Sequence, residues 1–303
     1  MPNCSAETNL VEQSLCNVWG QHMSTMLVAT DLSARADRAL KRALLLARQH
    51  KAELQILHIV DQTLSEAKAL REKDEAERLL SKLKTSDAAS KIPAITIEVK
   101  VGKGSRDILA HAEEVSADLI ILGARHSGKQ SIFRGTLCDH IVRRGNVPVL
   151  VVKDHPDQEY ERVAVAVDFS VHSRRAIEAA LNLAPAAKIN LVHAYHVPFE
   201  GRLGTPDARR EVNEREQQRM QQMVEEEMAA SLRALKGDTS RLHPILRYGD
   251  VKQVIRQEVG QLNPQLLALG THGRTGIAHA VLGSIAEDLL TDPLCDTLVV
   301  KAW

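Results

Sequence analysis

The sequence predicts an α/β protein made of two tandem domains, each built on a doubly wound parallel sheet. Short apolar runs alternate with longer amphipathic stretches from Met26 almost to the C-terminus. The order of these runs repeats, and Asp31-Leu-Ser33 in the first half returns as Asp168-Phe-Ser170 in the second. A glycine-rich segment that follows an apolar run in the second half also has a degenerate copy in the first. Repeated strand–helix units of this kind favour parallel sheets covered by helices on both faces.

The first half contains five apolar runs that we expect to be strands. They lie at residues 26–30, 54–60, 95–101, 119–122 and 147–152, and the intervening helices are expected at 33–49, about 64–84, about 105–116 and 136–144. In the first helix, Ala36, Leu40, Ala43 and Ala47 fall on one face, and Ser33 is a suitable N-cap. The first half therefore has the order of a five-stranded α/β domain.

The second half repeats this order. Strands are expected at residues 163–167, 189–194, 244–248, 266–269 and 297–301, and helices at 170–183, about 207–235, 251–261 and 284–291. The polar stretch 154–160 is typical of a linker. We expect a disordered extension at 1–25, an N-terminal domain at 26–153, the linker at 154–160 and a C-terminal domain at 161–303.

The composition excludes several classes of partner. Lys plus Arg and Asp plus Glu number 39 each, so the chain has no basic excess that would favour nucleic acid or an anionic membrane. Aromatic residues make up only 3%, too few for base-stacking platforms. There is no membrane-length apolar run, and the N-terminus does not read as a signal peptide. Cys4, Cys16, Cys138 and Cys295 show no paired spacing, so we expect reduced thiols in a cytoplasmic protein.

The glycine-rich segment of the second half predicts a phosphate site. Gly270, Gly273, Gly283 and Ser284 form the pattern G-x2-G-x9-G-S between an apolar strand and a helix. Glycines let the backbone approach an anion, and the N–H groups that begin a helix bind it. Asp168 follows the first strand of the same half, and ligands of doubly wound sheets lie beyond the strand ends. We therefore expect Asp168 and the glycine-rich segment to lie together in one ligand-binding crevice.

The same residues resemble the universal stress protein family. The similarity rests on G-x2-G-x9-G-S after a buried strand, on Val-Ala-Val-Asp168 and on Leu-Val-His193, and it extends over nearly the whole chain from Met26. It implies two adenine nucleotide alpha hydrolase-like domains packed as an intramolecular pseudo-dimer, with the fifth strands (147–152 and 297–301) paired antiparallel.

The resemblance also implies ATP or AMP as ligand, with or without Mg²⁺. Adenine contacts are expected at Ala166, Asp168, Ala194 and Leu269, and phosphate contacts at Gly270, Gly273, Gly283, Ser284 and Ile285. The family often has proline where Ala166 stands and valine where Ala194 stands. Both departures reduce apolar contact with the base, so we expect them to weaken binding without abolishing it.

The first half carries a degenerate form of the loop. Between Gly123 and Gly135 it is one residue shorter than its counterpart, and His126 replaces the second glycine. A β-carbon at this position crowds the phosphate path. We therefore expect a vestigial site framed by Asp31, Ile59, Gly123, Gly135 and Thr136, and about one tightly bound nucleotide per chain.

Two alternative sites are less favoured. Gly123-x4-Gly128-Lys129 approaches a P-loop, but Gln130 stands where Ser or Thr must bind magnesium. Four histidines (His193, His196, His272 and His279) could cluster near the crevice, but their spacing matches no metal motif. His58 and His193 occupy equivalent strand positions, so we expect a shared structural hydrogen bond.

These observations predict a stress-response protein that acts through nucleotide occupancy and is not an enzyme. No nucleophile with an adjacent base is visible, so at most weak ATPase activity is expected. The alternative is an ATP-independent stress or interaction protein that binds an apolar ligand or a protein partner, because Ala166 and Ala194 reduce base contact. The long charged helix at 207–235 leaves open a lid or a contact in a further homodimer.

Overall fold

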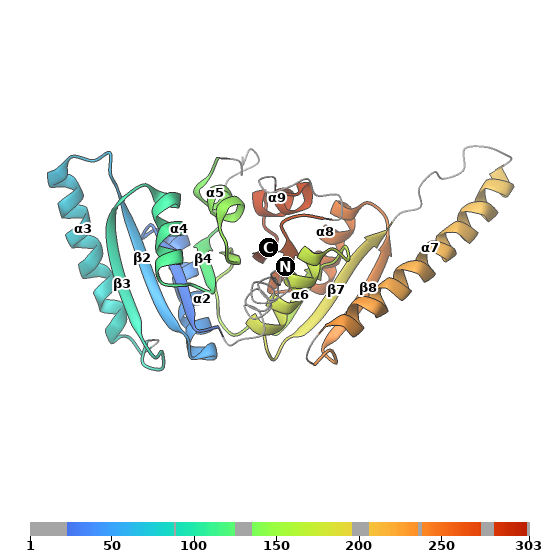
Figure 1. Cartoon of the computed structure of the whole chain (residues 1–303), viewed down its shortest axis with the longest axis horizontal. Coiled ribbons are helices and arrows are strands. Elements are labelled where there is room, and N and C mark those ends of the chain that lie inside the picture. Colours follow the sequence, from blue (N-terminus) through green and yellow to red (C-terminus); the bar gives the residue numbers. More distant parts are fainter. Residues whose placement is uncertain are drawn as a thin grey trace, which may run out of the picture.

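The computed structural model describes residues 23–87, 89–124, 135–195, 206–235, 238–273 and 282–301. Within these ranges the strands form one continuous sheet in the order β3-β2-β1-β4-β5-β10-β9-β6-β7-β8 (Figure 1). Residues 125–134, which include most of the P-loop-like segment that we disfavoured, lie outside the described residues, as do His196 and His279. The predicted α/β class is confirmed.

The N-terminal half follows the predicted order of elements. They are β1 (Thr25–Thr30), α2 (Ala34–His50), β2 (Glu53–Asp61), α3 (Glu66–Ser81), a short 3-10 helix (Lys82–Thr85), β3 (Ile95–Gly102), α4 (Gly104–Glu114), β4 (Leu119–Gly123), α5 (Leu137–Arg144) and β5 (Val149–Val152). Ser33 caps α2 by accepting a hydrogen bond from the Ala36 amide. The helix expected at about 64–84 is α3, which ends at Ser81, three residues before the predicted limit. The chain then continues as the 3-10 helix.

The C-terminal half repeats the arrangement. Its elements are β6 (Arg162–Ala166), α6 (Val171–Leu183), β7 (Lys188–Tyr195), α7 (Pro206–Ala234), β8 (Leu242–Tyr248), α8 (Val251–Leu262), β9 (Leu266–Gly270), α9 (Ser284–Thr291) and β10 (Asp296–Val300). In each half the strand order reverses beside the first strand, between β1 and β4 and between β6 and β9. Such reversals open a crevice at the carboxyl ends of the strands.

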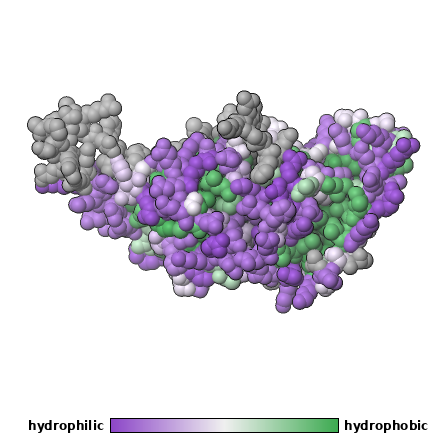
Figure 2. Space-filling view, turned by 180° about the vertical axis from the view of Figure 1, so that it is seen from behind, coloured by the Kyte–Doolittle hydropathy of each residue, from purple (hydrophilic) through white to green (hydrophobic). Residues whose placement is uncertain are grey.

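Helices cover both faces of the sheet. Side chains of α2, α3, α6 and α7 pack in one apolar cluster, and side chains of α4, α5, α8 and α9 pack in the other. Successive strand residues alternate between them, so Met26 and Val28 join the first cluster and Leu27 the second. Figure 2 shows mostly hydrophilic side chains over the back face, with smaller apolar areas between them. No helix in the described part of the chain is long and apolar enough to cross a membrane.

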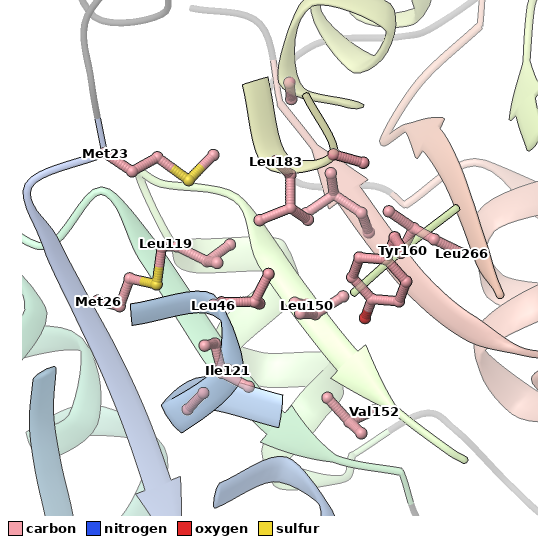
Figure 3. Packing of buried hydrophobic residues seen from close by; sticks show 14 of the residues in the cluster. Met23, Met26, Leu46, Leu119, Ile121, Leu150, Val152, Tyr160, Leu183 and Leu266 are labelled. Atoms are coloured by element: carbon pink, nitrogen blue, oxygen red, sulfur yellow. The ribbon is translucent and has the colours of Figure 1, made fainter. Parts of the chain in front are cut away.

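The two halves meet through their fifth strands. β5 and β10 pair antiparallel, with Val149 opposite Val299 and Val151 opposite Thr297, as predicted from the resemblance. All other strand pairs in the sheet are parallel. Leu150 on β5 and Leu183 on α6 lie in the core between the halves (Figure 3).

The expected N-terminal extension overlaps the folded domain. Met23 is only 7% exposed and packs in the core (Figure 3). The amide and hydroxyl of Ser24 donate to Asp118 Oδ2 at 2.7 and 2.9 Å, and Thr25 opens β1. Residues 23–25, expected in the extension, therefore belong to the folded domain, and residues 1–22 lie outside the described part.

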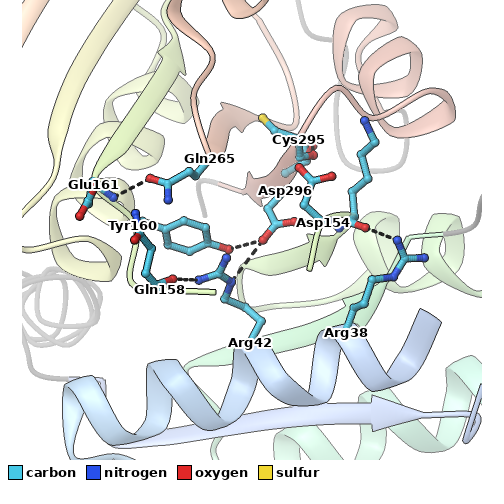
Figure 4. A network of polar contacts seen from close by, with 11 residues as sticks. Arg38, Arg42, Asp154, Gln158, Tyr160, Glu161, Gln265, Cys295 and Asp296 are labelled. Carbon is cyan, nitrogen blue, oxygen red and sulfur yellow. Dashed lines mark hydrogen bonds and ion pairs between the residues drawn. The ribbon is translucent and has the colours of Figure 1, made fainter. Parts of the chain in front are cut away.

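The linker ends in a buried polar network that joins the halves (Figure 4). The Tyr160 hydroxyl donates to Asp296 Oδ2 at 2.7 Å, and Arg42 Nε lies 3.3 Å from the same oxygen. The Arg42 guanidinium also stacks over the Tyr160 ring, 4.0 Å from its centroid. Asp296 Oδ1 accepts the amides of Lys153 and Asp154 at 2.8 and 3.1 Å. The stretch expected to be a polar spacer thus contributes a fully buried anchor.

We predict that this network contributes strongly to stability. Replacing Arg42 with Met leaves the buried Asp296 without its cation and should lower the free energy of unfolding by about 3 kcal/mol. Tyr160→Phe removes one buried hydrogen bond and should cost about 1–2 kcal/mol. Urea unfolding measures both. Lys41→Met on the same helix removes an exposed ion pair with Asp37 and should cost less than about 1 kcal/mol. Equal costs for Arg42→Met and Lys41→Met would contradict the prediction.

Candidate functional site

A pocket of about 450 Å³ opens in the C-terminal half. It lies at the carboxyl ends of β6, β7 and β9, where the strand order reverses, and α8 and the start of α9 complete its walls. Every residue that we expected to contact a nucleotide in this half lines it: Ala166, Asp168, Ala194, Leu269, Gly270, Gly273, Gly283, Ser284 and Ile285. Residues more than a hundred positions apart in the sequence therefore converge on one cavity.

The pocket also contains residues that sequence reasoning did not assign to it. Val251 and Ile255 reach it from α8, and Ser173 reaches it from α6. The four-residue spacing of Val251 and Ile255 places them on one face of a helix. That spacing was visible in the sequence, but only the packing of α8 against β7 and β6 shows which way the face turns.

Asp168 is fixed by a tight turn at the end of β6. Its Oδ1 accepts the Ser170 amide at 3.0 Å, and Phe169 between them has a φ of +62°. Ser170 in turn accepts the Ser173 amide and caps α6. The first half builds the same turn, with Asp31 Oδ1 accepting the Ser33 amide at 3.0 Å.

His193 and His58 share the structural role that their positions predicted. His193 Nδ1 lies 2.7 Å from the Val167 carbonyl oxygen, and His58 Nδ1 lies 2.8 Å from that of Thr30. A carbonyl oxygen only accepts, so Nδ1 carries the proton in each ring. The His193 ring also packs against Phe169 at a centroid distance of 4.4 Å. The shared structural hydrogen bond is confirmed.

The glycines of the loop serve different purposes. A Cβ at Gly270 would lie 2.6 Å from the His172 Cβ and 2.9 Å from its carbonyl carbon, so this glycine lets β9 approach α6. A Cβ at Gly273 would lie 2.8 Å from Asp168 Oδ2, which places Gly273 against the carboxylate. Gly283 has an ordinary φ of −60°, and its N–H donates to the Thr271 carbonyl at 2.8 Å. That amide is already used within the protein.

A histidine pair lies beside the loop. The rings of His172 and His272 are 5.2 Å apart, and His272 Nδ1 lies 3.0 Å from the Thr271 hydroxyl. Burial, followed by the charge of His272, lowers the pKa of His172 below its usual value, although Asp168 acts in the opposite direction. His172 therefore favours the neutral form at neutral pH.

The start of α9 provides the polar end of the pocket. Gly283, Ser284, Ile285 and Ala286 line the cavity, and Gly283 is the N-cap residue without a side-chain cap. The first amides of a helix have no partner within the helix, and they carry its partial positive charge. This end of the pocket is suited to an anion.

The corresponding helix of the first half is capped by its own side chains. Thr136 Oγ1 accepts the Asp139 amide at 3.1 Å, and Asp139 Oδ2 accepts the Gly135 amide at 2.9 Å. The side chain of Asp139 is only 7% exposed and also pairs with Arg143. A carboxylate therefore already lies at the N-terminus of α5.

The other expected residues of the first half are placed as follows. Asp31 is exposed and lies 3.6 Å from Arg35, and Ile59 is half-buried in β2. Burial works against it, but the hydrogen bonds from Ser33 and the charge of Arg35 hold the pKa of Asp31 below its usual value. A Cβ at Gly123 would lie 2.8 Å from the Arg35 carbonyl oxygen, so Gly123, like Gly270, is explained by close packing on a helix.

The described cysteines are poor nucleophiles. Cys138 and Cys295 are free thiols, and burial raises the pKa of each to about 12. Thiolate is the reactive form of cysteine. In the part of the chain that the structure describes, no cluster of histidine, cysteine and carboxylate side chains is arranged to hold a metal ion.

The fold and the pocket define a class of tandem α/β proteins with a ligand-sized pocket where the strand order reverses in the second half. A model of the universal stress protein family matches residues 23–153 and 159–301. The chain belongs to the universal stress protein family.

Curated relatives and solved structures agree with this assignment. Universal stress protein E of Salmonella typhi is 26% identical over 224 residues, which are 68% of this chain and 69% of that protein. Universal stress protein YxiE of Bacillus subtilis is 30% identical over 145 residues, covering 42% of this chain and 97% of that protein. The crystal structure of a universal stress protein from Archaeoglobus fulgidus has a TM-score of 0.66 and 20% identity, covering 93% of this chain and all of the other. This last likeness shows the fold.

We predict different effects on stability when alanine replaces each of three glycines. Gly270→Ala should destabilise the protein by about 2 kcal/mol, because the new Cβ meets the backbone of α6. Gly260→Ala, inside α8 with nothing within 4 Å of its Cβ position, should stabilise it by up to about 1 kcal/mol. Gly283→Ala should cost less than about 1 kcal/mol. Urea unfolding of the three variants gives the ranking, and a Gly283 variant less stable than the Gly270 variant would contradict it.

Proposed function

We propose that the C-terminal half binds one adenine nucleotide, ATP or AMP, and that the protein serves a stress response through the occupancy of this pocket. The observation that carries the proposal is the convergence of all nine expected contact residues on one pocket. Its volume of about 450 Å³ falls within the usual range of small-molecule sites.

The chemistry of the lining supports a definite orientation of the ligand. Ala166, Ala194 and Leu269 offer apolar surface for the base, and Val251 and Ile255 add to it from α8. Asp168 is an acceptor suited to an amino group or a ribose hydroxyl. The phosphates would then lie at the start of α9, near Gly273 and Ser284.

Differences between the halves support a single site per chain. In the first half Asp139 supplies the negative charge at the helix N-terminus, and Asp31 is paired with Arg35. A phosphate would have to displace one carboxylate and lie near the other. In the second half His172 replaces Arg35. The residue that corresponds to Asp139 is Glu287, whose Oε2 lies 3.5 Å from Arg143 Nη2.

The proposal assigns the protein a binding role in the cytoplasm and no rapid turnover. Mg²⁺ would enter with ATP, bound through the phosphates. Further pairing of whole chains into a homodimer is compatible with this role, and α7 extends outward beside β8 (Figure 1). The rival function, an ATP-independent protein with an apolar ligand, is favoured by the small side chains of Ala166 and Ala194.

Titration calorimetry with ATP and Mg²⁺ tests the proposal. We expect one site per chain with a dissociation constant in the roughly micromolar range. Asp168→Ala should weaken binding at least about tenfold by removing the hydrogen-bond acceptor. Asp31→Ala, the matched change in the first half, should leave the affinity and the stoichiometry unchanged. Two equivalent sites, or sensitivity to Asp31 rather than Asp168, would contradict the proposal. Mass spectrometry of ligand released from the purified protein separates a nucleotide from an apolar molecule.

A further inference from the structure

The helix that begins at the phosphate end of the pocket carries a carboxylate in its first turn. Ser284, Ile285 and Ala286 line the pocket, and Glu287 follows them directly. A negative charge here attracts the same helix N-terminus as a phosphate and repels the phosphate itself. An uncompensated Glu287 carboxylate would therefore oppose the binding of an anion at this end of the pocket.

The first half shows what a carboxylate does at this position. Asp139 lies four residues after Gly135, as Glu287 lies four residues after Gly283. Asp139 folds back on its own helix and accepts the Gly135 amide at 2.9 Å. In the first half, a carboxylate at this point in the repeat thus occupies the helix N-terminus. In the second half, the corresponding Gly283 amide donates to the Thr271 carbonyl, so Glu287 would act on this terminus through its charge.

Glu287 is directed across the interface between the halves. Arg143, from α5 of the N-terminal half, places Nη2 3.5 Å from Glu287 Oε2 and uses Nε to bind Asp139. The two carboxylates share one guanidinium that is only 20% exposed. The position of Arg143 corresponds to Thr291 in α9, where the hydroxyl donates to the Glu287 carbonyl. The C-terminal half therefore has no equivalent arginine of its own.

The remaining carboxylates of α9 are neutralised from within the C-terminal half. Asp288 pairs with Arg256 at 3.0 Å and with Lys252 at 3.7 Å, both on α8. Asp292, at the end of α9, lies 3.3 Å from Arg256. Glu287 differs from both because it also pairs with an arginine of the other half, Arg143.

We propose that Arg143 is a positioning residue for the nucleotide site of the opposite half. It holds the Glu287 carboxylate away from the N-terminus of α9 and neutralises it, so that the phosphate end of the pocket stays available to an anion. The inference rests on the proposed nucleotide binding. It means that the C-terminal site depends on the N-terminal half, whose own helix terminus is closed by Asp139.

ATP titration of the full chain tests this inference with four variants. Arg143→Gln should weaken ATP binding about three- to tenfold, because the positive charge beside Glu287 is removed. Arg143→Lys should retain most of the affinity, since the charge stays. Glu287→Gln should bind at least as well as the wild type. The double variant R143Q/E287Q should recover the wild-type affinity, because the carboxylate that Arg143 restrains is gone.

Arg144→Gln is the charge-matched control on the same helix. Arg144 is exposed, so its loss changes the net charge equally and should leave ATP affinity unchanged. Circular dichroism and urea unfolding confirm that each variant is folded. A purely structural role of Arg143 predicts that R143Q/E287Q binds no better than R143Q, and that result would overturn the inference. Unchanged affinity of R143Q would overturn it as well. Absence of ATP binding in the wild type would overturn the proposed function, and this inference with it.

Discussion

The antiparallel pairing of β5 with β10 is the contact on which the whole arrangement depends. It joins two five-stranded parallel units into one sheet and removes two edges that would otherwise expose unpaired backbone groups. Asp296, the first residue of β10, is central to this junction. Its carboxylate accepts hydrogen bonds from the two backbone amides that follow β5, and it pairs with Arg42 of α2. The linker thus connects the halves both covalently and through the buried Tyr160 side chain.

The same junction brings the C-terminal end of α5 close to the first turn of α9. Arg143 can therefore contact both Asp139 of its own helix and Glu287 of α9. Tandem duplication creates two equivalent crevices, but the structure makes them chemically unequal. One carboxylate occupies the helix terminus of the first half, and its counterpart in the second half, Glu287, pairs with Arg143 of the first. Neighbouring charge, and not only the number of glycines in each loop, therefore distinguishes the two halves.

The loop glycines show how a sequence motif combines two requirements. Gly123 and Gly270 are equivalent, and each is placed where a Cβ would meet the backbone of the first helix of its half, α2 or α6. Their presence in both halves follows from the strand–helix packing that the two halves share. Gly273 lies against Asp168 instead, and the first half has no glycine at this position. A glycine motif therefore indicates ligand binding only where packing does not already explain the residue.

Sequence patterns predicted the order of strands and helices, their limits to within a few residues, and nine of the residues that line the pocket. Hydrophobic periodicity, Ser33 as an N-cap and the repeated Asp-x-Ser sequence depend on neighbouring residues, so they can be recognised without tertiary information. The burial of Met23 and Tyr160, the contribution of α8 to the pocket and the contact of Glu287 with Arg143 become visible only in the folded chain. These depend on contacts between residues far apart in the chain, where the identity of one residue does not reveal which other residue packs against it.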